Sequence, residues 1–197
     1  MRKLILAAIA CAIATMALAA PTASAQTVGG CELDGTASFT PGLNTEAKGF
    51  SYSFNGVLGS CQSSDAAAPT SGTVSAGEVV TIGGVQFQEP VPSGNGSCLS
   101  STTAGTAIVT WADGTQTVVD YSTTGAAAAV HLDGSVADSV TLQSVDGTTS
   151  TTVATTRYAG ASALGLLEFS PPDPTACNTP EGVSSAGISG FVGLGSQ

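Results

Sequence analysis

Few residues in this chain have side chains suited to acid–base catalysis. His131 is the only histidine among the 197 residues, and in the segment AVHLDG it alternates with Asp133 along an expected strand. Residues i and i+2 of a strand lie on one face, so the pair has the geometry of a general base. The apolar neighbours Val130 and Leu132 occupy the other face, which places His131 on the solvent side. We therefore interpret His131 as a surface residue.

Carboxylates offer the other catalytic possibility. Glycoside cleavage needs two of them facing each other across a cleft, and the 14 acidic residues include Asp120, Asp138 and Glu168 in or beside strand-like runs. The sequence contains no G-x-S-x-G elbow, phosphate-binding loop or dinucleotide fingerprint. It favours a non-enzymatic protein with no cofactor, and a polysaccharide hydrolase using paired carboxylates is the alternative.

Aromatic residues are the candidates for a binding site. Phe50, Tyr52 and Phe54 alternate along one expected strand, so their side chains share a face. We interpret this face as a core stripe, with a row for stacking on a polysaccharide as the alternative.

Trp111 is the only tryptophan and lies in the segment TAIVTWADGTQTVVDY. If Asp113-Gly114 is a two-residue turn, Trp111 pairs with Gln116 and shares a face with Val109 and Val118. This position predicts packing at the edge of the core, and a ligand platform is the alternative.

The charge of the chain restricts its partners. The formal net charge is −10, and beyond residue 25 the only basic residues are Lys48 and Arg157, which leaves about −12 on the rest. Two basic residues are too few to neutralise a row of phosphates, which argues against nucleic acid and anionic membrane surfaces as partners.

The first 25 residues have the pattern of a secretory signal peptide. Arg2 and Lys3 precede the apolar run 4–20, and Ala23-Ser24-Ala25 is a small-residue cleavage site. We expect cleavage after Ala25, a secreted extracellular product, a single all-β domain over 26–197 and no integral membrane association. Lipidation at Cys11 is the alternative.

Four cysteines follow the expected cleavage site, namely Cys31, Cys61, Cys98 and Cys177. An even number in an exported protein predicts two disulfides, and four cysteines allow three pairings. We favour Cys31–Cys61, which would join the opening strands, and Cys98–Cys177, which would join two Pro-rich loops. The spacings match no zinc site, and we expect no bound metal.

Runs rich in Val, Thr and Ser, separated by turn residues every 8 to 15 positions, predict an all-β fold. We expect one antiparallel β-sandwich, or a short barrel, of about nine or ten strands with two disulfides. The expected strands are 33–40, 48–60, 72–87 with a break at 83–84, 104–112, 115–123, 127–132, 138–145, 150–157, 162–169 and 184–194. The Pro-containing stretches 62–72, 88–103 and 170–182 are expected to be loops.

The pair Asp-Gly, followed by Thr or Ser, occurs at residues 34, 113, 133 and 146. Each pair is expected to form a tight turn, because Asp and Gly tolerate the positive φ angles of such turns. Calcium binding by these aspartates is the alternative.

Four segments carry a resemblance to a known group. They are CELDGTASFTPGLNTEAKGFSYSFNGVLGSCQSS, GTAIVTWADGTQTVVDYS, TRYAGASALGLLEFSP and ACNTPEGVSSAGISGFVGL. With them the chain resembles small exported proteins of actinobacteria, a group with no assigned biochemical function. The resemblance implies a secreted, disulfide-bonded β-sandwich and carries over no catalytic residue. The step Tyr158-Ala159-Gly160-Ala161 also resembles a turn in allene-oxide-cyclase-like and dirigent barrels.

Together these features predict a monomeric extracellular module for binding or structure, with a cell-surface polysaccharide or a protein as its partner. A self-assembling surface protein is a further alternative. The charge-free run 184–194 would favour pairing between chains if it formed an exposed edge.

Overall fold

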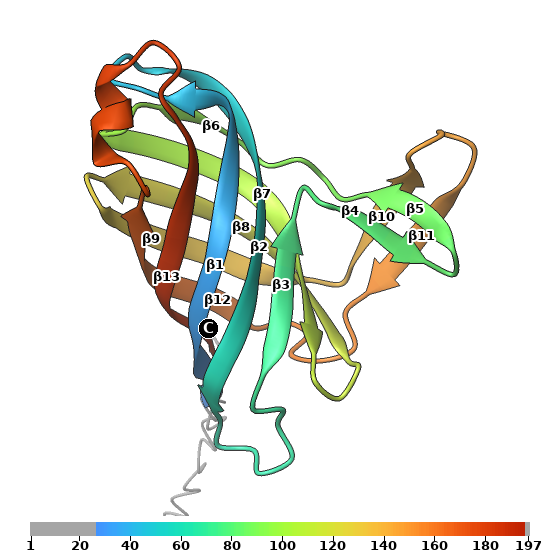
Figure 1. Cartoon of the computed structure of the whole chain (residues 1–197). Coiled ribbons are helices and arrows are strands. Elements are labelled where there is room, and N and C mark those ends of the chain that lie inside the picture. Colours follow the sequence, from blue (N-terminus) through green and yellow to red (C-terminus); the bar gives the residue numbers. More distant parts are fainter. Residues whose placement is uncertain (1–26, 196–197) are drawn as a thin grey trace, which may run out of the picture.

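Thirteen strands and one short 3-10 helix make up residues 27–195, the part of the chain that this computed structural model describes (Figure 1). The elements are β1 (Thr27–Leu43), β2 (Lys48–Gln62), β3 (Gly72–Ala76), β4 (Val79–Ile82), β5 (Val85–Gln88), β6 (Ser93–Gly96), β7 (Ser100–Trp111), β8 (Gln116–Ala126), β9 (Ala129–Ala137), β10 (Ser139–Ser144), β11 (Ser150–Ala154), β12 (Ser162–Ser170), η1 (Pro174–Asn178) and β13 (Val183–Gly195). The predicted signal peptide and Cys11 lie outside the described residues.

Nine strands form one antiparallel sheet that closes into a barrel. Their order is β1-β13-β12-β9-β8-β7-β3-β2-β6, and β1 also pairs with β2. Strands β3 and β6 pair with different parts of both β2 and β7, so together they fill one place and the ring has eight positions. Closure leaves the long strands without a free edge.

The remaining four strands form a small sheet, which we call the arm (Figure 1). The chain leaves the barrel twice, between β3 and β6 and between β9 and β12, and the two excursions meet where β5 pairs with β10. The arm is anchored by apolar packing. Phe87, Leu142 and Val153 of the arm pack with Ile108 and Val118 of β7 and β8. Because Leu142 and Val118 are fully buried, this contact is a true core between the arm and the barrel wall.

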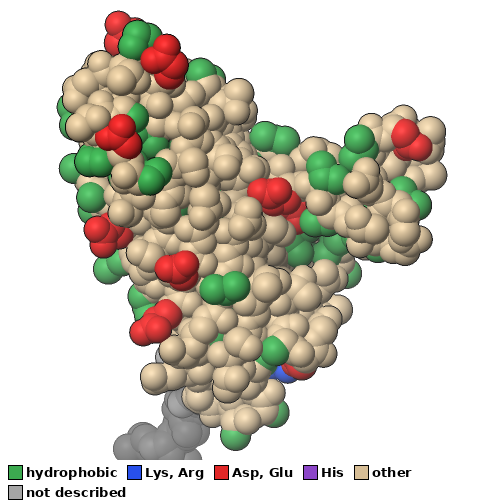
Figure 2. Space-filling model, viewed as in Figure 1, with side chains coloured by type: hydrophobic (Ala, Val, Ile, Leu, Met, Phe, Trp, Pro, Cys, Tyr) green, Lys and Arg blue, Asp and Glu red, His purple; other side chains and the backbone are tan. Residues whose placement is uncertain are grey.

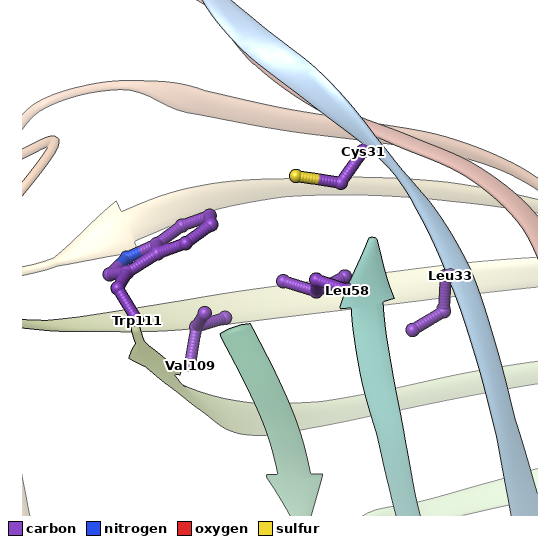
Figure 3. Packing of buried hydrophobic residues seen from close by; sticks show 5 residues of the cluster. All are labelled: Cys31, Leu33, Leu58, Val109 and Trp111. Carbon is purple, nitrogen blue, oxygen red and sulfur yellow. The ribbon is translucent and has the colours of Figure 1, made fainter. Parts of the chain in front are cut away.

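A second core lies inside the barrel. Cys31, Leu33, Leu58, Val109 and Trp111 come from three strands, β1, β2 and β7, and point toward one another (Figure 3). Strand alternation accounts for this arrangement, since every second residue of a barrel strand faces inward.

Both favoured disulfides are present. Cys31–Cys61 joins β1 to β2 with a Cα–Cα distance of 4.0 Å, and Cys98–Cys177 joins the β6–β7 turn to η1 with a Cα–Cα distance of 6.0 Å. The second bridge holds η1 against the end of the barrel at which β6 and β7 meet. Disulfides of this kind are typical of proteins from oxidising compartments.

The all-β, antiparallel prediction is confirmed, and the large sheet is a barrel with an attached arm. The strand number was underestimated at two places. The expected strand 72–87 breaks at Gly77, which has a φ of +72°, as well as at Gly83 and Gly84. Strand β6 lies within the stretch 88–103, which its prolines predicted to be a loop, and its sequence, SGNG, has no apolar alternation to indicate a strand.

The prediction of four Asp-Gly turns was half right. Gly114 and Gly147 have positive φ and lie in turns, whereas Gly35 and Gly134 lie inside β1 and β9. These two glycines serve close packing instead: a Cβ at Gly35 would lie 2.7 Å from the Phe54 ring, and one at Gly134 would lie 3.2 Å from the Tyr121 Cα.

The predicted register of the β7–β8 hairpin was wrong by one residue. Thr110 pairs with Gln116, and the Trp111 N–H donates to the Thr115 carbonyl, so the loop has three residues rather than two. A one-residue shift moves the side chains of one strand to the other face. Thr117 therefore joins Trp111 inside the barrel, and Val118 faces the arm.

Candidate ligand-binding cavity

The barrel contains a cavity of about 200 Å³. Its lining extends from Gly29 and Pro69 at one end of the barrel to Phe39 and Phe169 near the other. A modest volume spread over this length makes the cavity long and narrow. None of the described side chains that line it carries a charge.

One end of the cavity is an aromatic cluster. Phe39 lies 6.0 Å from Phe50, 6.0 Å from Tyr52 and 5.9 Å from Phe169, measured between ring centroids. Each ring comes from β1, β2 or β12 and points inward by strand alternation. Edge-on and tilted rings at these distances form a stable apolar wall.

The other end is formed by Trp111 and Tyr158. Their rings meet edge to face with centroids 5.3 Å apart. The indole Nε1 donates to Thr117 Oγ1 at 2.8 Å, and that hydroxyl donates to the Arg157 carbonyl. The guanidinium of Arg157 lies 5.5 Å from the centre of the Tyr158 ring and pairs with Asp113 at 2.8 Å. Tyr158 has a φ of +66°, which is uncommon for a tyrosine, and these contacts hold it there.

Four hydroxyl groups in the cavity wall are joined by hydrogen bonds. Tyr52 Oη lies 2.7 Å from Tyr121 Oη and 3.1 Å from Thr103 Oγ1, which lies 2.8 Å from Thr123 Oγ1. We call these four residues the hydroxyl chain. Its members come from β2, β7 and β8 and all line the cavity.

The two phenols of the hydroxyl chain stay neutral. Burial raises the pKa of Tyr52, and it raises the pKa of Tyr121 strongly, with further contributions from Tyr52 and from the nearby Glu89 carboxylate. Both groups therefore remain protonated donors over the pH range in which proteins fold.

Glu89 is a buried carboxylate between the arm and the barrel, with 1% of its surface exposed. One oxygen accepts from Ser75 Oγ at 2.6 Å and the other from the Glu78 N–H at 3.1 Å. Burial raises its pKa above the ordinary 4.5. The folded state thus holds a proton that the unfolded state has already released, so Glu89 costs stability as the pH rises from 4.5 through its folded pKa.

This cost gives a testable pH dependence. The stability of the natural protein minus that of Glu89→Gln should be larger near pH 4.5 than at neutral pH. Urea unfolding of both proteins across this range measures the difference. Glu181→Gln, at an exposed site, controls for the loss of one negative charge. A difference that does not change with pH would contradict the assignment.

The structure divides the candidates proposed from sequence into two groups. Phe50, Tyr52, Phe54 and Trp111 all line the cavity, and the exposed fractions of Phe50 and Trp111 are 5% and 6%. These aromatic rings face the inside of the barrel rather than an outer surface.

The catalytic candidates lie elsewhere. His131 Nδ1 is 2.8 Å from Asp133 Oδ2, and both side chains are more than half exposed, as expected for a surface pair. Asp120, Asp138 and Glu168 are exposed and none of them lines the cavity. Figure 2 shows acidic side chains scattered over a largely uncharged surface. Within residues 27–195, no three His, Cys, Asp or Glu side chains are grouped so that they could hold a metal ion.

Several cavity residues were not recognised from the sequence, namely Phe39, Thr103, Tyr121, Thr123, Tyr158 and Phe169. Alternation along the strands indicates that each of them except Tyr158, which lies in the turn between β11 and β12, shares a face with apolar neighbours. It does not indicate that these faces meet around a common interior, because that depends on closure of the sheet.

Comparison of the chain with protein families, curated proteins and solved structures found no match. The resemblance to exported actinobacterial proteins stays a prediction. The step 158–161 forms a turn, in which the Ala161 N–H donates to the Tyr158 carbonyl at 3.1 Å. Across the described part of the chain, no helix has the length and apolar character needed to span a membrane.

Proposed function

We propose that this protein is a secreted, non-enzymatic binding protein that holds a small apolar molecule inside its barrel. The observation that carries the proposal is the uncharged cavity of about 200 Å³, lined by aromatic and aliphatic side chains. An apolar cavity of about 150 Å³ in another protein stays dry and binds benzene. The larger volume here is enough for a slender ligand of somewhat greater size.

The inward direction of the aromatic rings favours a small molecule over a polymer. Phe50, Tyr52 and Phe54 face the barrel interior, where a volume of about 200 Å³ leaves no room for a polysaccharide chain. The hydrolase alternative needs two carboxylates at one cleft, and the described lining of the cavity supplies none. The run 184–194 lies in β13, which is paired with β1 on one side and β12 on the other, so it is no exposed edge.

Trp111 provides the test, because the only tryptophan of the chain lines the cavity. We expect n-hexane and n-octanol each to produce a saturable change in its fluorescence, with heat of binding in calorimetry. Ala107 faces the cavity from β7, and Ala107→Phe should fill the space and weaken binding at least about tenfold.

Ala112→Phe makes the same substitution at an exposed turn position and should leave binding unchanged. The proposal is overturned if neither ligand binds saturably, or if Ala107→Phe binds as well as the natural protein.

A further inference from the structure

The hydroxyl chain is a polar site in the cavity wall, and the hydrogen bonds that it can offer a ligand can be counted. Each of the four hydroxyl groups carries one hydrogen, and the three contacts between them use three. One O–H hydrogen is left to donate, and lone pairs remain to accept. Any member of the chain can present this hydrogen, since the direction of each bond is free to reverse.

The described lining of the cavity has no positively charged side chain that could pair with an anionic ligand. Of the two basic residues in the described chain, Arg157 is paired with Asp113 behind Tyr158, and Lys48 does not line the cavity. The charged group that acts on Tyr121 is the Glu89 carboxylate, which would repel an anion. A buried ion without a partner is strongly disfavoured, and one O–H donor does not replace the hydration of a carboxylate.

We propose that the natural ligand is an uncharged, slender apolar molecule with one oxygen-bearing head, an alcohol or a ketone, which hydrogen-bonds to the hydroxyl chain. This inference rests on the proposed function and specifies its ligand. The head accepts the spare hydrogen of the chain, and an alcohol also donates to one of its lone pairs. The apolar body extends along the cavity between the aromatic cluster and Trp111.

Tyr52 is the centre of this arrangement because it contacts both Tyr121 and Thr103. Removing its oxygen breaks two of the three contacts, so the remaining hydroxyl groups lose the partners that orient them, while the ring keeps its place beside Phe39 and Phe50. Thr103→Val is a second, nearly isosteric way to break the chain. Thr106→Val is the matched control, since Thr106 lies on the same strand and bonds to Asp120 outside the cavity.

The experiment compares n-octanol, methyl hexyl ketone and octanoate by calorimetry, with n-hexane as the ligand that has no oxygen. At neutral pH the alcohol and the ketone should bind at least about tenfold more tightly than octanoate. Octanoate should gain affinity as the pH falls and its own carboxyl group becomes neutral. Tyr52→Phe and Thr103→Val should each weaken n-octanol about three- to tenfold, because the remaining hydroxyl groups are no longer held in position to bond the ligand oxygen, and should leave n-hexane unchanged.

Ionised octanoate that binds as tightly as n-octanol would overturn this inference and leave the apolar cavity as the site. The same holds if Tyr52→Phe and Thr103→Val weaken n-octanol no more than Thr106→Val does. Failure of n-hexane and of every other ligand to bind would instead overturn the proposed function, and the inference with it.

Discussion

The Trp111→Ala variant is expected to lose about 3–5 kcal/mol of unfolding free energy, the range for removal of a buried aromatic side chain. Trp111 is 6% exposed and packs with Cys31, Leu33, Leu58 and Val109. Its loss also removes the edge-to-face contact with Tyr158 and the hydrogen bond to Thr117, a residue with no exposed surface. Because the tryptophan is itself the fluorophore, unfolding should be followed by circular dichroism.

The conservative variant separates packing from hydrogen bonding. Trp111→Phe keeps a ring next to Tyr158 but lacks the N–H that donates to Thr117, so it should lose clearly less stability than the alanine variant. A Trp111→Ala variant that lost less than about 1 kcal/mol would contradict the packing described for this residue.

Removal of either disulfide is the second large effect. The bridges join residues separated by 30 and 79 positions. Loop-closure entropy predicts a loss of about 4 kcal/mol for each, with about 1 kcal/mol more for the longer loop. The two loops do not overlap in sequence, so the losses should be nearly additive.

The variants are Cys31→Ala/Cys61→Ala and Cys98→Ala/Cys177→Ala, compared by urea unfolding under identical conditions. Cys31 lies in the barrel core and Cys177 in η1 at the barrel end, so the pair tests whether loop length or burial decides the cost. A loss from Cys98→Ala/Cys177→Ala clearly smaller than that from the first variant would contradict the loop-entropy account.

Local patterns in the sequence predicted the strands well, and they failed where the outcome depended on how faces meet. The inward face of Phe50, Tyr52 and Phe54 follows from alternation alone, and the structure confirms that they share it. The sequence predicted that Trp111 shares its face with Val118. The three-residue loop shifts the register by one, so Thr117 lies on that face instead. The Asp-Gly pattern does not distinguish a turn at Gly114 from a close approach at Gly35.

The cavity itself could not be predicted from the sequence. Tyr52 and Tyr121 are 69 positions apart, and their 2.7 Å contact exists because the sheet curves, which brings together the inner faces of β2 and β8 although β7 and the place of β3 and β6 lie between them. Alternating residues in a sandwich would fill the space between two sheets, whereas closure of this sheet into a barrel leaves room at its centre. The inward-facing residues would thus have the same strand conformation in a sandwich and in a barrel, but only in the barrel do they line a cavity.

A crystal structure of the protein soaked with n-octanol tests the central claim most directly. We predict electron density for the alkyl chain inside the barrel, between Trp111 and the aromatic cluster, with the ligand oxygen within hydrogen-bond distance of the hydroxyl chain. An interior with no ligand density, in crystals where the alcohol binds only to the outer surface, would contradict the account.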